Sequence, residues 1–135
     1  MYIKKILEYN YNYAEYLVSD GECDLKCMCV SVPLPNNKEP YVGMQVIEIH
    51  PFCVHGITII KITNDEYKNY KIIDSTNDYF KYTLRGRLID SKRGIVEVFG
   101  FIISLEFEYP EGLCDDLYDG DFIEFVVDRL DCRII

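Results

Sequence analysis

A chain of 135 residues that is 49% hydrophobic and 27% charged is long enough for one domain with a substantial core, and this composition excludes an intrinsically disordered protein. Its 23 acidic residues outnumber its 14 lysines and arginines. The net charge of −9 excludes nucleic-acid binding through overall charge, because such binding depends on neutralising phosphates. Twelve tyrosines, seven phenylalanines and many isoleucines favour pleated sheet over helix.

The amino-terminal third of the chain predicts a hairpin followed by a loop. Residues 9–19 are typical of extended chain and end at Asp20 and Gly21, a dipeptide found in tight turns. In residues 22–30 polar side chains alternate with leucine and cysteines, which predicts a half-buried strand. Residues 31–40 contain three prolines and two asparagines and therefore predict a surface loop.

The middle of the chain predicts two short strands around a turn. Residues 44–49 and 57–62 are apolar runs rich in β-branched side chains, and residues 50–56 separate them. The polar residues 63–70 predict either one helical turn or a loop. At most one short helix is therefore expected.

The clearest element is a long hairpin formed by residues 79–89 and 95–107 around a five-residue connection that ends in glycine. If residue 89 pairs with residue 95, Gly86 faces the core opposite Val98. A turn-rich link over residues 109–121 follows this hairpin. The last predicted strand, residues 122–127, places its apolar side chains Ile123, Phe125 and Val127 on one face.

Glycines inside both arms of this hairpin, Gly86 and Gly100, and a turn at Gly120 and Asp121 before the closing strand resemble the OB-fold barrels. The resemblance covers roughly residues 12–130. It implies one small antiparallel β-barrel, closed or partly open, that spans residues 1–135 as a single domain. The chain also resembles small acidic bacterial proteins of no assigned activity that end in a sequence similar to residues 126–132, a match that carries over no functional residues.

The cysteines of residues 23–29 raise the possibility of a metal site, a disulfide or a reactive thiol. A zinc site would use Cys27 and Cys29 with His50, Cys53 and His55, but zinc sites usually pair their ligands around tight turns. Six cysteines in this chain are too few for a disulfide scaffold, and cytosolic thiols stay reduced. We expect no bound metal or cofactor, and cysteines that line the core.

Cys53 stands between two histidines, which suggests a thiol enzyme. Catalytic cysteine and histidine residues are normally distant in sequence and are brought together by the fold. The local spacing of these three residues is therefore no evidence for catalysis. We expect no enzyme.

One segment is locally basic. The hairpin predicts an outer face that presents Lys81, Arg85 and Arg87 opposite Phe99 and Phe101, similar to the stacking platforms with which OB-folds hold single strands. The alternative is that Arg87 pairs with a glutamate and that Arg85 covers Phe99, so that these residues have a structural role only.

From charge, we expect a non-catalytic cytoplasmic binding module whose acidic surface engages a basic protein, in the manner of an inhibitor or immunity protein. The alternative function is single-stranded nucleic-acid binding through the basic face, and the third is a zinc- or thiol-dependent enzyme. Residues 1–10 lack an apolar run typical of export signals, and no apolar run is long enough to cross a membrane. These features predict that the protein is cytoplasmic and has no membrane partner.

Overall fold

The computed structural model describes residues 1–10, 13–29, 39–69, 72–74, 81–106 and 108–134. The predicted loop at 31–40 therefore lies almost entirely outside the described residues. Within them the chain forms strands and one short helix: β1 Tyr2–Tyr9, β2 Ala14–Ser19, β3 Asp24–Cys29, β4 Val46–Phe52, β5 Ile59–Ile62, α1 Asn64–Asn69, β6 Ile72–Asp74, β7 Tyr82–Asp90, β8 Ile95–Val98, β9 Phe101–Ser104, β10 Phe122–Val127 and β11 Arg129–Ile134. The prediction of a mainly β chain with at most one short helix is confirmed.

The strands form one sheet in the order β1-β2-β3-β11-β4-β9-β8-β7-β10-β5, and β6 pairs with β7. Most neighbours are antiparallel, but β3 runs parallel to β11 and β4 runs parallel to β9. The strand path ends at β1 and β5 and does not return to its start. The predicted barrel is therefore not confirmed.

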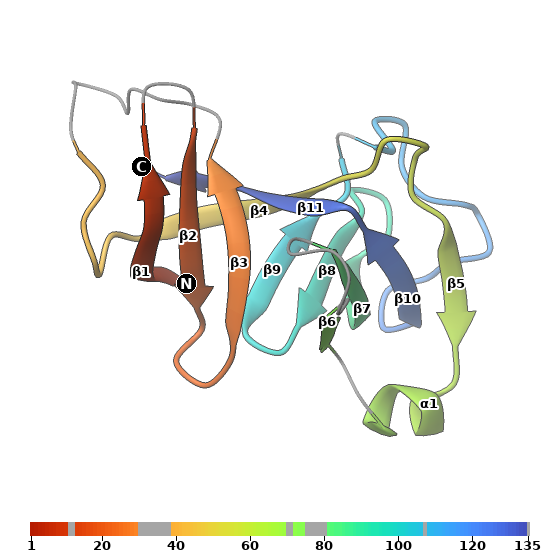
Figure 1. The fold of residues 1–135 in the computed structure, drawn as a ribbon. Coiled ribbons are helices and arrows are strands. Elements are labelled where there is room, and N and C mark those ends of the chain that lie inside the picture. Colours follow the sequence, from red (N-terminus) through yellow and green to blue (C-terminus); the bar gives the residue numbers. More distant parts are fainter. Residues whose placement is uncertain (11–12, 30–38, 70–71, 75–80, 107, 135) are drawn as a thin grey trace.

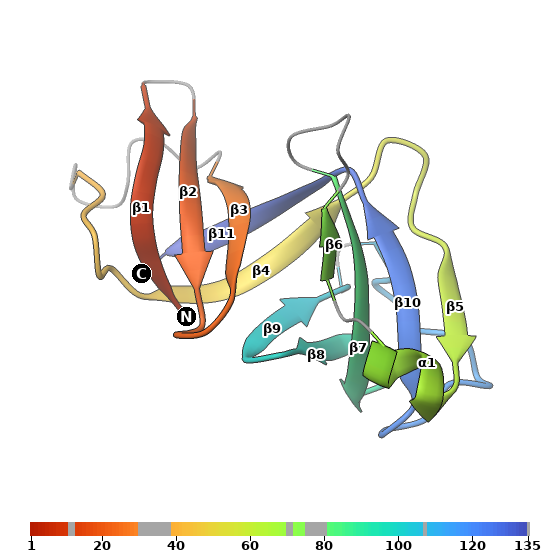
Figure 2. The ribbon, with the colours of Figure 1, turned by 60° about the horizontal axis from the view of Figure 1, so that its bottom comes forward.

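The strands gather into two groups that β4 and β11 connect. Strands β1, β2 and β3 lie on one side, and β5 to β10 lie with α1 on the other (Figures 1 and 2). Strands β4 and β11 pair with each other from Phe52 and Arg129 at one end to Val46 and Ile134 at the other. These two strands therefore belong to both groups.

Strand β1 also contacts the chain that leads into β4. Backbone hydrogen bonds run from Ile3 N to Met44 O at 2.9 Å and from Val46 N to Met1 O at 3.0 Å. Tyr2 forms a bridge with Gln45 between these two bonds. As a result β1 has backbone partners on both of its edges.

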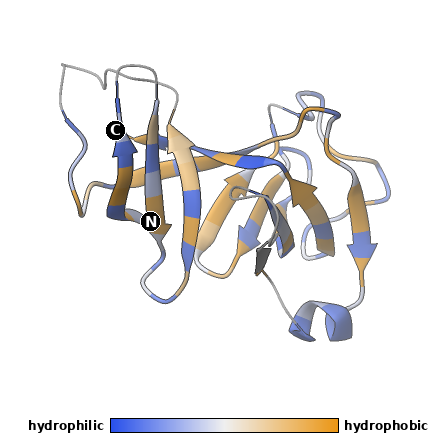
Figure 3. Cartoon of the chain, viewed as in Figure 1, coloured by the Kyte–Doolittle hydropathy of each residue, from blue (hydrophilic) through white to orange (hydrophobic). Residues whose placement is uncertain are grey.

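The core is one continuous cluster of apolar side chains drawn from both groups of strands. The predicted inward face of β10 is confirmed, because Ile123, Phe125 and Val127 are buried. Cys27 and Cys29 are also buried, as predicted, whereas Cys23 is half-buried. Apolar colour runs along β4 and β10, while α1 is mostly polar (Figure 3).

Helix α1 begins with a capping box. Glu66 N donates to Thr63 Oγ1 at 3.1 Å, and Thr63 N donates to Glu66 Oε1 at 3.2 Å, so each residue satisfies the other's free backbone donor. Tyr67 then stacks on Phe122 of β10 with 4.4 Å between ring centroids. The helix covers one end of β10.

The predicted hairpin of β7 is correct in its middle and wrong at its turn and beyond Val98. Arg87 pairs with Glu97 and Leu88 with Val96 as predicted, but a register shift between Leu88 and Asp90 pairs Ile95 with Asp90 instead of residue 89. The strand predicted over residues 95–107 is in fact two strands, because the chain reverses at Phe99 and Gly100. Phe99 has a φ of 52° there, and Gly100 lies in a turn instead of a strand interior.

Four further elements differ from the prediction. Strand β4 continues through residues 50–52, where a turn was predicted, and β1, β6 and β11 were not predicted. Irregularities in β1 at Ile3–Lys5 and Ile6–Glu8 break its alternation of apolar and polar side chains, which hides it in the sequence. Strand β11 does alternate, with Leu130, Cys132 and Ile134 buried.

Candidate functional site

The predicted basic and aromatic residues do not share one face. Phe101 is fully buried, so its predicted outward position is wrong. The reversal at Phe99 is the reason, because it returns Phe101 to the inward face beside Val98. Phe99 is 38% exposed, Arg87 is exposed and Lys81 is half-buried before β7.

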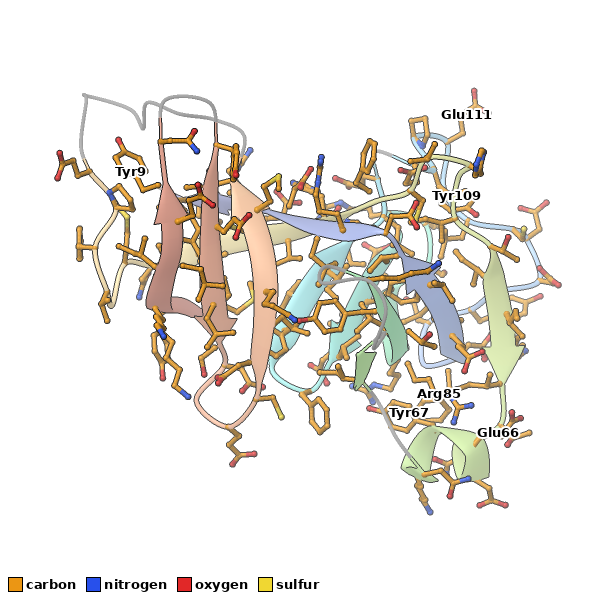
Figure 4. The ribbon with its side chains drawn as sticks, viewed as in Figure 1. Tyr9, Glu66, Tyr67, Arg85, Tyr109 and Glu111 are labelled. Carbon is orange, nitrogen blue, oxygen red and sulfur yellow. The ribbon has the colours of Figure 1, made fainter. Side chains whose placement is uncertain are left out.

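Arg85 is held by groups of the protein itself. Its Nε donates to Glu124 Oε1 at 2.8 Å, and its Nη1 donates to the carbonyl oxygen of Glu66 in α1. The side chains of Arg85 and Glu124 are only 10% and 21% exposed. In Figure 4 Arg85 lies beside Glu66 and Tyr67. This arginine ties α1 to the sheet, which leaves little of its guanidinium for a nucleic-acid strand.

The five residues that a zinc site would use are spread over separate places. Cys27 and Cys29 are buried in the core, whereas Cys53 is half-buried and His55 is exposed. His50 lies on β4 with its Nε2 3.3 Å from a carboxylate oxygen of Glu48. Across the described part of the chain, no group of three or more His, Cys, Asp or Glu side chains is placed to hold a metal ion.

Cys53 and His55 do line a common groove of about 310 Å³, together with Ile60, Glu124 and Val126. The Cys53 thiol donates to the carbonyl oxygen of Val126 at 3.3 Å. Burial raises the pKa of this thiol, more than the nearby backbone N–H of Asp128 lowers it. Catalytic cysteines usually carry a lowered pKa, and the surroundings of Cys53 do not lower it.

The feature that sequence reasoning missed is an acidic edge at the far end of β1 and β2. We define the acidic edge as Glu8, Tyr9, Tyr13 and Glu15. Glu8 and Glu15 are direct cross-strand partners, so their side chains project from neighbouring positions on the same face. Tyr13 donates from its hydroxyl to Glu8 Oε2 at 3.3 Å, and Tyr9 is 41% exposed. Figure 4 shows Tyr9 at the end of β1, far from α1.

The two carboxylates of the acidic edge act on each other. Partial burial and the charge of Glu8 both raise the pKa of Glu15. None of the ion pairs found among the described residues includes Glu8 or Glu15. Like charges directly opposite each other in a sheet are destabilising. The repulsion between Glu8 and Glu15 therefore lowers the stability of the protein when no partner is bound.

A signal for the acidic edge was present in the sequence. Residues 8–15 read Glu-Tyr-Asn-Tyr-Asn-Tyr-Ala-Glu, in which the two glutamates stand symmetrically around asparagines. Asparagine favours turns, and Asn10 does accept a hydrogen bond at its Oδ1 from Tyr13 N at 3.1 Å. Reading these residues as a hairpin would have placed Glu8 opposite Glu15.

Comparison with known proteins adds no relative to this description. No helix within the described ranges is long and apolar enough to cross a membrane. No protein-family model, no curated protein and no solved structure matches this chain.

Proposed function

We propose that this protein is a non-catalytic binding module whose acidic edge engages a basic protein partner, in the manner of an inhibitor or immunity protein. The observation that carries the proposal is the direct pairing of Glu8 with Glu15 across β1 and β2. A lysine or arginine of a partner placed between the two carboxylates would remove their repulsion. The repulsion destabilises the free protein and is absent from the complex. Its relief would therefore favour binding.

The tyrosines of the acidic edge support the same class of partner. Tyr9 is exposed beside the carboxylates, and Tyr13 is held toward Glu8 by its hydroxyl. Aromatic rings attract the cationic groups of arginine and lysine, and tyrosine is enriched in protein interfaces. The net charge of −9 adds a field that would draw a basic protein toward this surface.

The arrangement of the first strand group supports an OB-like barrel as the scaffold of this module. Strands β1, β2, β3, β11 and β4 follow one another, and the backbone bonds of β1 to residues 43–46 lead back to the first strand. The OB-fold is a five-stranded, partly open barrel of this size. In this proposal residues 53–128 form an insertion before the last barrel strand.

The acidic edge can be tested with the double variant Glu8→Gln/Glu15→Gln. Because it removes the repulsion, we expect it to unfold at a higher urea concentration than wild type, with a gain of about 0.2–1 kcal/mol at pH 7. Its affinity for a basic partner purified with the wild-type chain from the native host should fall at least tenfold. Titration calorimetry measures that affinity.

The matched control is Asp115→Asn/Asp116→Asn, which changes net charge equally at two exposed residues far from β1 in the chain. We expect this control to keep the partner's affinity within about twofold. Equal losses in both double variants would mean that overall charge, and not the acidic edge, attracts the partner. An unchanged affinity in the Glu8 and Glu15 variant would overturn the proposal.

A further inference from the structure

Two cysteines far apart in sequence lie opposite each other in the core. Strands β3 and β11 are parallel, and Met28 pairs with Asp131. The next residue along each strand is Cys29 and Cys132, which places these two cysteines directly across the strand boundary. Both side chains point inward, with 1% and 6% of their surfaces exposed.

The spacing of the two strands suits a covalent link between these cysteines. Neighbouring strands lie about 4.7–4.9 Å apart, and disulfides join Cα atoms separated by about 4.4–6.8 Å. In the reduced protein the two thiols interact directly. A hydrogen bond with Cys29 raises the pKa of the Cys132 thiol, and burial raises it further.

A polar group stands near both thiols. The Tyr16 hydroxyl is buried and has no hydrogen-bond partner among the described residues. Tyr16 pairs with Cys27 across β2 and β3, so its side chain projects from the same face of the sheet as Cys27 and Cys29. Burial raises the pKa of this phenol, and the charges of Cys29 and Cys132 raise it further. Tyr16 therefore offers a donor that can stabilise a thiolate as it forms.

The boundary between β3 and β11 also has one of the shortest strand ladders in the described part of the sheet. Only Met28 and Asp131 are paired across it among the described residues, whereas β2 and β3 share six pairs. A boundary with few ladder bonds opens locally more easily than a long one. An opening there would bring both thiols into contact with water, where their pKa would return toward the ordinary value of a cysteine and a thiolate could form.

We propose that Cys29 and Cys132 form a redox-active dithiol that a small disulfide of the glutathione class oxidises to a protein disulfide. One cysteine thiolate attacks a sulfur of oxidised glutathione and displaces the first glutathione thiolate, which leaves a mixed disulfide between the protein and the second glutathione. The second cysteine thiolate attacks the protein sulfur and releases a second glutathione thiolate. The protein loses two electrons and two protons in total, and the small disulfide gains the electrons.

The new bond would link β11 covalently to β3 across their short strand ladder. Because it joins residues far apart in the chain, it would also restrict the unfolded state strongly. Reduction would release β11 again. This inference does not depend on the acidic edge or on the proposed partner.

The test uses the folded wild-type chain incubated with oxidised glutathione, alkylated and digested with trypsin without reduction. We expect a peptide containing Cys29 to be linked to residues 130–133, with the loss of two hydrogens. No lysine or arginine separates Cys27 from Cys29, so fragment spectra must assign the linked sulfur. The oxidised protein should melt several degrees higher than the reduced protein, and dithiothreitol should reverse the shift.

The variants separate this pair from the other thiols. Cys53→Ala/Cys114→Ala removes one half-buried and one exposed thiol and should keep both the link and the melting shift. Cys132→Ala should lose both. A link from Cys132 to Cys27, a link between other cysteines, or glutathione adducts alone in the wild-type digest would each overturn the proposal, whether or not the variants fold.

Discussion

Gly86 occupies the tightest position that we find in the β7–β8 hairpin. A Cβ built at this residue would lie 2.5 Å from Val96 Cγ1 and 2.7 Å from the carbonyl oxygen of Glu97. One of these atoms belongs to the backbone of the partner strand, so it cannot move aside without disturbing the ladder. Residue 86 therefore has no room for a side chain, and only glycine fits there without displacing atoms of β8.

We expect Gly86→Ala to lower the stability of the protein. Overpacking of this kind costs about 1–3 kcal/mol, which for a domain of this size lowers Tm by roughly 5–15 °C. The control is Arg87→Ala, an exposed position on the same strand, which should shift Tm by no more than about 2 °C. Equal melting of wild type and Gly86→Ala, measured by circular dichroism, would contradict the packing described for this hairpin.

The turn between β2 and β3 connects the two strand groups through one carboxylate. Asp20 accepts hydrogen bonds from Cys23 N at 2.7 Å and Glu22 N at 2.9 Å, and from Gly100 N at 2.8 Å. Gly100 belongs to the turn between β8 and β9, in the other strand group. One side chain thus organises its own turn and holds a second one.

These bonds make the contribution of Asp20 depend on pH. Partial burial raises the pKa of Asp20, but the backbone N–H groups of Cys23, Glu22 and Gly100 outweigh it, so the pKa in the folded protein is lowered. A carboxylate of this kind stabilises the fold above its unfolded pKa, near 3.9, and this contribution is lost as pH falls through the lower folded value.

Asp20→Asn should therefore be less stable than wild type at pH 7 by about 1–3 kcal/mol. Because a protonated aspartate resembles asparagine, the difference should shrink as pH is lowered from about 5 to 2. Urea unfolding midpoints at several pH values measure it. A difference that stays constant over this range would show that the Asp20 charge has no such role.

At the level of elements, the sequence predicted local patterns better than pairings. The alternation in β3 and β10 was sufficient to assign their inward faces, since burial alternates along a strand. The reversal at Phe99 was missed because an apolar run on both sides resembles one continuous strand. The parallel pairing of β3 with β11, and with it the meeting of Cys29 and Cys132, depends on contacts between distant parts of the chain that no local pattern records.

The whole molecule has one core despite its two strand groups. Tyr16 in β2, Phe101 in β9 and Phe125 in β10 all belong to the same cluster of buried side chains. Strand β11 pairs with β3 of the first group, β4 pairs with β9 of the second, and β4 and β11 pair with each other. Neither group can therefore lose its packing without exposing apolar surface of the other.

We expect thermal unfolding to occur in a single cooperative step. The calorimetric enthalpy of unfolding should equal the van't Hoff enthalpy, as it does for small two-state domains. Circular dichroism and tyrosine fluorescence should report the same midpoint. Two resolved heat-absorption peaks would mean that the strand groups unfold independently, in conflict with their shared core.

At the scale of the whole molecule, the candidate site depends on the acidic net charge. The acidic composition was enough to predict a basic partner, but it could not locate the surface, because 23 acidic residues are spread along the chain. Only the pairing of β1 with β2 singles out Glu8 and Glu15. That pairing was hidden because the irregular β1 does not have the pattern of a strand.

The pairing of Phe52 with Arg129 has an evolutionary consequence. Residues 53–128 leave the β4–β11 ladder and return to it at directly opposed positions, so their two ends lie about one strand spacing apart. Segments with such closely spaced ends can be gained or exchanged without disturbing the structure that receives them. A chain with another segment at this junction would still have to cover the apolar surface of the first strand group that residues 53–128 now bury.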